Sequence, residues 1–197
     1  MKNLWSKIKI SALFGALALS QNIKAQELDS LDKKYFLKIE IGQYIFYENW
    51  LGKLMQFGLE NETSLTKNTG LNFGIEYGSQ KSETNNQNYG LTKFSLKFGL
   101  NNYFLTSNNK KTSVYGSFGV NYTKISENPA KIEDRAIKDG AAIGFNYGGG
   151  IESSLSSRTK FFLEIKLNES AIKGYKEKID ISGKMLSAGL KMRMDKK

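Results

Sequence analysis

The sequence predicts an all-β fold, an eight-stranded antiparallel up-and-down transmembrane β-barrel preceded by a cleaved signal peptide. Two observations lead to this prediction. From about Tyr35 to Met194, apolar and polar residues alternate with a period of two in eight separate blocks, and such a period puts one set of side chains on each face of a strand. The first 25 residues carry the features of an export signal. An even number of two-faced strands behind such a signal is typical of barrels that span a membrane.

The export signal sets the first boundary of the chain. Three lysines precede an apolar stretch from Ile10 to Ser20, and Ala25 offers a cleavage site. This stretch is too short to cross a bilayer as a helix, and a retained interfacial anchor is the alternative interpretation. The predicted organisation is a signal peptide at 1–25, a periplasmic N-terminal lead at 26–34, the β-barrel domain at 35–194 and a C-terminal tail at 195–197.

The alternating blocks give the predicted strands. In the block at 93–100, Phe94 and Phe98 share one face, and Lys93 and Lys97 share the other. The block at 114–122 is looser because Gly116 interrupts its apolar phase. The eight predicted strands, in order, lie at 37–45, 55–60, 71–78, 93–100, 114–122, 143–152, 161–168 and 186–193.

The connections between these blocks differ in length. Long polar segments at 79–89, 124–139 and 169–184 contrast with the short turn at 155–159. Bacterial barrels place long loops at the outer end and short turns at the periplasmic end, so this asymmetry favours a membrane barrel. The connection at 47–53 departs from the pattern, because it is shorter than the following turn at 61–69.

Alternation alone does not say which face is inside, because a soluble lipocalin-like barrel would turn its apolar face inward. The glycines favour a polar interior. Ten glycines of the blocks fall in the polar phase, and only Gly116 and Gly149 clearly fall in the apolar phase. Glycine weakens a strand on a water-facing exterior, whereas small residues in a crowded lumen make room for larger neighbours. The apolar phase is therefore predicted to face lipid.

The charges of the polar phase support the same sidedness. They form a near-balanced set that consists of Lys38, Glu40, Glu60, Glu76, Lys93, Lys97, Glu152, Glu164, Lys166, Lys191 and Arg193. Balanced charges inside a narrow barrel can pair with one another, as a low-dielectric interior requires. We predict a structural charge network in the lumen. A narrow gated conduit is the alternative, although eight strands leave an interior only wide enough for side chains.

Aromatic residues gather near the ends of the predicted strands. Amphipathic rings sit well at the level of lipid headgroups, which predicts interfacial girdles. Ligand stacking is the alternative and would need a cleft. The predicted interfacial aromatics are Tyr44, Phe46, Tyr47, Trp50, Tyr103, Phe104 and Tyr122.

Composition limits the possible functions. The chain contains no cysteine and no histidine, so it can build neither a Ser-His-Asp triad nor a histidine-based zinc site. We assign no catalytic, metal-binding or cofactor-binding residue and expect no enzyme. Removal of the signal peptide takes away four lysines and no acids, so the formal net charge falls from +10 to +6. The sequence shows no dense Lys/Arg stripe or aromatic RNA-binding motif, so no nucleic acid is expected as a partner.

The segment from Leu91 to Tyr122 contains a strand ending in Gly-Leu-Asn-Asn-Tyr-Phe, a polar turn, and Val-Tyr-Gly-Ser-Phe-Gly at 114–119. With the glycine-rich strand at 142–152 and Lys-Phe-Phe-Leu-Glu at 160–164, it resembles the small outer-membrane β-barrel family of Bacteroidetes-type bacteria. The likeness covers nearly the whole mature chain and includes no catalytic motif. Such barrels usually end on an aromatic residue, whereas this final strand ends on Met192 and Met194, followed by a charged tail.

The resemblance implies a location in the cell outer membrane. We expect a structural or surface-interaction role without catalysis, with outer-membrane lipid, lipopolysaccharide and the barrel assembly machinery as partners. The long loops offer a site for a surface partner. The first alternative is a narrow channel or carrier for small or hydrophobic solutes, and the second is a soluble periplasmic lipocalin-like binding barrel.

Overall fold

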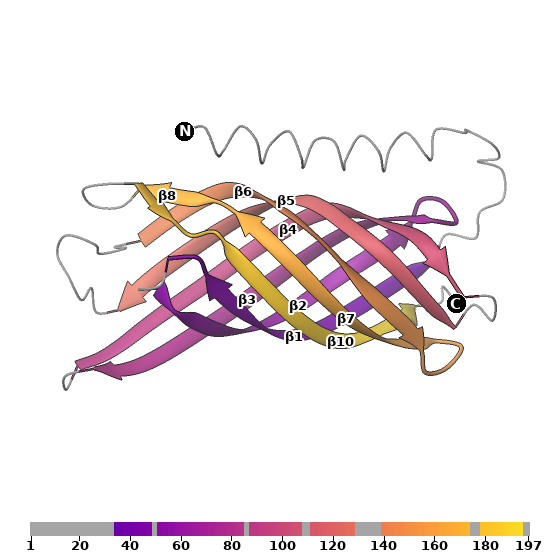
Figure 1. The fold of residues 1–197 in the computed structure, drawn as a ribbon, viewed down its shortest axis with the longest axis horizontal. Coiled ribbons are helices and arrows are strands. Elements are labelled where there is room, and N and C mark those ends of the chain that lie inside the picture. The colour runs from indigo at the N-terminus through magenta and orange to yellow at the C-terminus, as the bar shows by residue number, and fades with distance from the viewer. Residues whose placement is uncertain are drawn as a thin grey trace. The chain divides into compact units, whose positions relative to one another are not determined.

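The computed structural model describes residues 34–48, 51–84, 87–107, 111–128, 139–173 and 178–194. Within these residues the chain forms a closed barrel of eight antiparallel strands, in the order β1-β10-β7-β6-β5-β4-β3-β2 (Figure 1). The predicted signal peptide, all of the lead except Lys34, Trp50 and the C-terminal tail lie outside the described residues.

The eight barrel strands cover each of the eight predicted blocks. They are β1 (Tyr35–Phe46), β2 (Lys53–Ser64), β3 (Thr69–Thr84), β4 (Gln87–Thr106), β5 (Thr112–Asn128), β6 (Asp139–Ser154), β7 (Thr159–Glu169) and β10 (Gly183–Met194). The first and last of them close the barrel, pairing from Tyr35 with Met194 to Phe46 with Gly183. Two short strands, β8 (Ala171–Lys173) and β9 (Lys178–Asp180), form a separate hairpin between β7 and β10.

The burial pattern confirms the predicted sidedness. In β1 the polar phase is inside, with Lys38 and Glu40 each 2% exposed, whereas Ile39 and Ile41 are 43% and 46% exposed. The other barrel strands repeat this arrangement, and their outward side chains include many exposed large apolar residues. The soluble lipocalin-like alternative is wrong, because it requires the apolar phase to fill the interior. No helix in the described ranges is long and apolar enough to cross a membrane.

The connections differ from the predicted lengths at several points. β2 continues to Ser64, so the turn before β3 is only residues 65–68. The predicted polar loop at 79–89 is mostly strand, because β3 and β4 remain paired as far as Thr84 with Gln87. Backbone pairing does not require apolar side chains, and polar residues therefore extend this hairpin. The segment at 169–184 contains β8 and β9 instead of an irregular loop.

Candidate functional site: the filled barrel lumen

Inward-facing charges meet in the middle of the barrel. We call this set the central network. Its members come from β1, β2, β3, β4 and β7 and are Lys38, Glu40, Glu60, Glu76, Lys93, Lys97, Glu164 and Lys166. Four lysines thus face four glutamates, and the side chains are at most 5% exposed. The network is neutral when all eight groups are ionised.

Ion pairs in the central network join strands that are distant in the sequence. Lys38 Nζ lies 2.6 Å from Glu164 Oε2 and donates a hydrogen bond to it. Lys166 Nζ lies 2.8 Å from Glu164 and 3.4 Å from Glu40. Lys97 lies 3.3 Å from Glu40 and also pairs with Glu76. Because each of these three lysines contacts more than one glutamate, the pairs form one connected network and not isolated bridges.

In this network the burial of the charges costs free energy, and their pairing with one another returns it. Removing an ammonium or a carboxylate from water is costly, and pairing with additional hydrogen bonds offsets that cost. Glu40 has such extra contacts, because it receives a weak hydrogen bond from the Ser187 hydroxyl at 3.4 Å. The ring of Phe162 lies 4.3 Å from Lys38 Nζ, a distance at which a cation is attracted to an aromatic face.

A second group of charges closes the lumen near the short turns. We call it the basal cluster, which consists of Glu62, Tyr103, Glu152, Lys160 and Lys191. Lys191 Nζ lies 2.8 Å from Glu62 and 3.2 Å from Glu152. Tyr103 donates its hydroxyl proton to Glu62 at 2.8 Å, and Lys160 pairs with Glu152. These side chains join β2, β4, β6, β7 and β10 around one point.

The predicted set of lumen charges differs from the observed set near the end of the barrel. Ten of the predicted residues are buried, but Arg193 is exposed, because β10 reaches the end of the barrel there. Glu62 and Lys160 belong to the basal cluster and were missed. Glu62 continues the polar phase of Gln56 and Glu60, so the period of two contained the signal for it.

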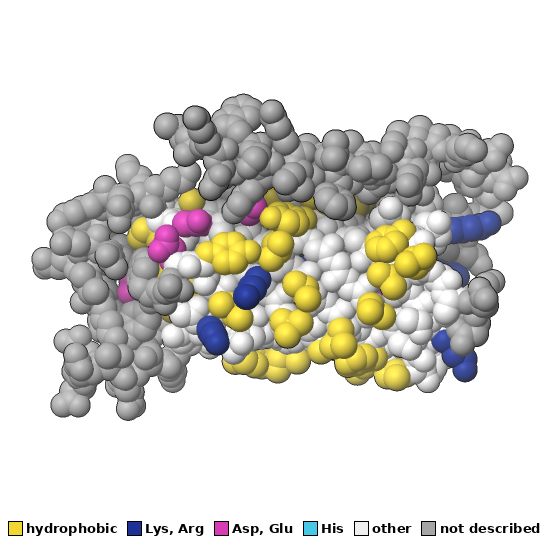
Figure 2. Space-filling view, in the orientation of Figure 1, with side chains coloured by type: hydrophobic (Ala, Val, Ile, Leu, Met, Phe, Trp, Pro, Cys, Tyr) yellow, Lys and Arg dark blue, Asp and Glu magenta, His cyan; other side chains and the backbone are white. Residues whose placement is uncertain are grey.

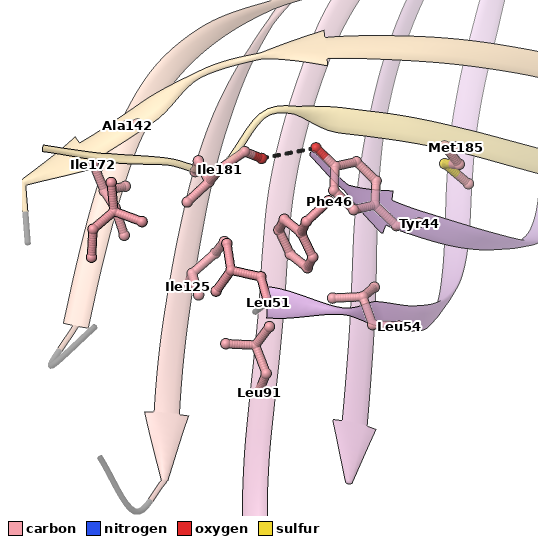
Figure 3. Close-up of a cluster of buried hydrophobic side chains, with 11 residues drawn as sticks. Tyr44, Phe46, Leu51, Leu54, Leu91, Ile125, Ala142, Ile172, Ile181 and Met185 are labelled. Carbon is pink, nitrogen blue, oxygen red and sulfur yellow. Dashed lines mark hydrogen bonds between the residues drawn. The ribbon is translucent and has the colours of Figure 1, made fainter. Parts of the chain in front are cut away.

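Apolar side chains close the opposite end of the lumen. We call this group the apolar cap (Figure 3). It consists of Tyr44, Phe46, Leu51, Leu54, Leu91, Ile125, Ala142, Ile172, Ile179, Ile181 and Met185. The side chains come from the barrel wall, from the β1–β2 turn and from the β8–β9 hairpin. Gly52 has a φ of 71°, which glycine adopts without strain, in the turn that buries Leu51 in the cap.

Hydrogen bonds hold the β8–β9 segment against β1 and close its base. The Tyr44 hydroxyl donates to the Ile181 carbonyl at 3.0 Å (Figure 3), and the Tyr47 backbone N–H donates to the Ser182 carbonyl at 2.9 Å. The Ile181 N–H donates to the Ser170 carbonyl at 3.0 Å. The cap also meets the central network, because Lys93 Nζ lies 3.9 Å from the centre of the Tyr44 ring.

Three predicted interfacial aromatics are in the lumen, which corrects the girdle assignment. Tyr44 and Phe46 are 0% and 3% exposed in the apolar cap, and Tyr103 belongs to the basal cluster. These residues lie in the inward-facing phase of β1 and β4. The face of the strand, and not nearness to its end, decides which surroundings the side chain contacts. The remaining described members, Tyr47, Phe104 and Tyr122, are exposed.

Inward glycines make the space that this packing needs. A Cβ atom on Gly58 would lie 2.6 Å from Glu40 Cγ, and one on Gly150 would lie 2.7 Å from the Tyr115 hydroxyl. Real Cβ atoms do not approach other heavy atoms so closely. Charged side chains and aromatic rings in the lumen therefore occupy the space that glycines leave by lacking a side chain. Within the described ranges, no group of three or more Asp and Glu residues is placed to hold a metal ion.

No protein-family model matches the sequence, and no curated protein matches it either. The outer membrane protein OprG from Pseudomonas aeruginosa is similar in structure, with a TM-score of 0.57 and 12% identity over 83% of this chain and 97% of that one. Neisserial surface protein A gives a TM-score of 0.55 and 13% identity over 82% and 97% of the two chains.

A major outer membrane protein from Thermus thermophilus gives a TM-score of 0.54 and 12% identity over 83% of this chain and all of that one. Identities this low show a shared fold. Membership of the Bacteroidetes-type family stays a prediction. The chain has the fold of the eight-stranded outer-membrane β-barrels, and its exposed apolar exterior is the surface that such a barrel presents to lipid.

Proposed function

We propose that the protein is an integral outer-membrane barrel with a structural or surface-interaction role and no catalytic activity. The observation that carries this proposal is the filled lumen. The central network occupies its middle, while the apolar cap and the basal cluster close its two ends. A barrel whose interior is packed in this way acts through its exterior and its loops and not by conducting solutes.

The β3–β4 hairpin supports a surface-interaction role. β2 pairs with β3 only as far as Ser79, and β5 pairs with β4 only as far as Gly90. Beyond these points β3 and β4 remain paired with each other and, within the described residues, with no other strand. The hairpin therefore extends past its neighbours at the long-loop end (Figure 1). Backbone edges that no described strand pairs with would suit a partner that adds a strand.

The proposed surroundings follow from the barrel exterior. Outer-membrane lipid and lipopolysaccharide would contact the apolar belt, and the barrel assembly machinery would insert the chain. The resemblance to Bacteroidetes-type barrels supports this assignment.

Cell fractionation and gel mobility test the membrane assignment. The full chain is expressed in a Gram-negative host, and the outer membrane is separated from the soluble fraction. We expect the protein in the outer membrane, with a band that shifts on boiling as the barrel unfolds. An epitope inserted at residues 85–86 should label on intact cells. A soluble protein without a heat-dependent shift would contradict the proposal.

A narrow channel is the second candidate, because buried charges line the lumen between its two closed ends. Planar-bilayer recordings separate the two functions. A packed lumen predicts no stepwise conductance above the bilayer background in the folded protein. Regular conductance steps that are absent from heat-denatured samples would favour the channel.

A further inference from the structure

Two neighbouring strands, β5 and β6, contribute none of the charges of the central network, which come from β1, β2, β3, β4 and β7. The inward positions of β5 and β6 at this height carry only small or uncharged polar residues. We call them the β5–β6 wall, which consists of Ser117, Gly119, Asn121, Gly144, Asn146 and Gly148. One side of the lumen is therefore polar without being charged.

Each polar side chain of the β5–β6 wall faces a glycine on the neighbouring strand. The opposed residues are Ser117 and Gly148, Asn146 and Gly119, and Asn121 and Gly144. In an antiparallel pair, the residue directly opposite is the nearest partner for a side chain. A glycine offers no side chain for this purpose, so the register itself leaves these three polar groups without a partner across the strand pair.

The lumen side chains of β3 and β4 show the contrast. Asn72 Nδ2 donates to Asn101 Oδ1 at 2.9 Å, and Asn101 Nδ2 donates to Glu62 Oε2 at 2.6 Å. These amides form a chain of hydrogen bonds that leads into the basal cluster. Inward amides elsewhere in this barrel are thus paired with other side chains.

Each polar side chain of the wall keeps one atom without a hydrogen-bond partner among the described residues. Ser117, Asn121 and Asn146 are 9%, 3% and 6% exposed, so all three are buried. The Asn121 amide is held in place because its Nδ2 donates to Thr123 Oγ1 at 2.7 Å. The unpartnered atoms are Ser117 Oγ, Asn121 Oδ1 and Asn146 Nδ2. Buried polar groups in native proteins are nearly always hydrogen-bonded, either to protein or to ordered water.

Two lysines of the central network border the wall and show that it has room beside it. Lys97 on β4 is in register with Asn121, and Lys166 on β7 is in register with Gly148. Their side chains keep 5% and 4% of their accessible area, although the apolar cap and the basal cluster close the lumen at both ends. Accessible area on a side chain inside a closed lumen means that a water-sized sphere fits next to it.

We propose that the β5–β6 wall is a water-binding site inside the closed lumen. A water molecule both donates and accepts hydrogen bonds, and buried waters typically make about three. Water can donate to Asn121 Oδ1, accept from Asn146 Nδ2 and do either with Ser117 Oγ. It can also accept protons from the ammonium groups of Lys97 and Lys166. The proposal goes beyond the role assigned above, because bound solvent becomes part of the packing that fills the lumen.

Oxygen-17 magnetic relaxation dispersion tests the proposal, because its amplitude reports waters that stay long enough to tumble with the protein. The folded protein is measured in detergent micelles, and empty micelles give the baseline. We expect a clear amplitude for the wild type. Asn121→Leu and Asn146→Leu each replace an amide by an apolar group of the same branched shape, and each should reduce the amplitude. The double variant should lose most of it.

Asn61→Leu is the matched control. Asn61 is exposed on β2, and a leucine suits the barrel exterior, whose visible face already carries many hydrophobic side chains (Figure 2). This variant makes the same chemical change outside the lumen, so it should keep the wild-type amplitude. An equal loss in the control and in the wall variants would show that the signal does not come from the wall, and would overturn the proposal.

Two further results would overturn the proposal. The first is a wild-type amplitude no larger than that of empty micelles, which would mean that the wall is dry. The second is an amplitude that the wall variants keep, which would place the waters elsewhere. The heat-dependent gel shift shows which variants are folded. If the leucine variants do not fold, Ser117→Ala replaces them, because it removes a hydroxyl without adding atoms, and an unchanged amplitude in this variant would equally overturn the proposal.

Discussion

The Lys38 ammonium lies 2.6 Å from the Glu164 carboxylate inside the barrel, and this contact joins β1 to β7 across 126 residues of sequence. β10, which closes the barrel by pairing with β1, lies between these two strands. The ion pair therefore reaches across β10. Both side chains are nearly inaccessible to solvent. The pair therefore links the packing of the lumen to the closure of the barrel, and the first prediction concerns it.

The substitution Lys38→Met should strongly destabilise the barrel. It leaves Glu164 with one cation fewer and gives the buried central network a net negative charge. Loss of one partner of a buried pair typically costs about 3–5 kcal/mol. Urea unfolding in lipid vesicles, followed by the loss of the heat-dependent gel shift, measures the change. The double variant K38M/E164Q restores the neutrality of the central network and should recover much of the stability. If stability is not recovered, the loss of charge balance is not the cause of the destabilisation.

Gly99→Ala should destabilise the barrel through steric overlap. A Cβ at this inward position would lie 2.6 Å from the Phe118 carbonyl oxygen and 3.1 Å from Gly119 Cα. Both neighbours are backbone atoms, which cannot rotate away, and overpacking of this kind costs about 1–3 kcal/mol. Gly116→Ala is the matched control, because its nearest atoms lie 3.8 Å away on the outer face. The same unfolding assay should show equal or greater stability for the control, and equal losses would refute the steric explanation.

Ile75→Arg should destabilise the barrel in lipid. Ile75 is 41% exposed on the outer face and pairs with the outward residues Leu59 and Leu96. An arginine on the lipid-facing side costs about 2–4 kcal/mol near the bilayer midplane and about 0–1 kcal/mol near the interface. Leu155→Arg, in the turn between β6 and β7, is therefore the control. Unfolding midpoints in vesicles of one lipid should separate the two variants, and similar midpoints would contradict the assigned lipid belt.

The buried lysines should resist chemical modification. Lys97 and Lys166 are 4% and 3% exposed, whereas Lys53 and Lys184 are exposed near the long-loop end. An amine-reactive reagent, followed by mass spectrometry of peptides, should label the second pair rapidly in the folded protein. Label should reach the first pair only after urea unfolding. Equal labelling of both pairs before unfolding would mean that reagent enters the lumen, which would favour the channel.

The period of two in the sequence already indicated that three of the predicted interfacial aromatics face the lumen. Tyr44 and Phe46 share the phase of Lys38 and Glu40, so their inward orientation followed from their positions alone. Tyr103 likewise shares the phase of Lys97. Nearness to a strand end suggested headgroup contact, but the face on which a side chain lies decides whether it meets lipid. The same reasoning applied to Glu62 would have added it to the lumen.

Other features had no sequence signal of this kind. The outer part of the β3–β4 hairpin, at 79–89, is polar, so it does not show the apolar alternation that marks a half-buried strand. β8 and β9 are three residues each, which is too short for a reliable period. Their isoleucines are buried only because the hairpin packs at the lumen mouth, where Tyr44 bonds to the Ile181 carbonyl.

The sequence by itself determined the strands and the face of each strand, because alternation is a local property that each block carries independently. It also determined that the lumen would be charged, nearly balanced and lined with small residues. Only the tertiary structure decided which charges meet. Lys38 reaches Glu164, and Lys191 reaches Glu62, because barrel closure and register bring distant strands to the same height. Closure also brought side chains from several strands together in the apolar cap, which is a property of no single block.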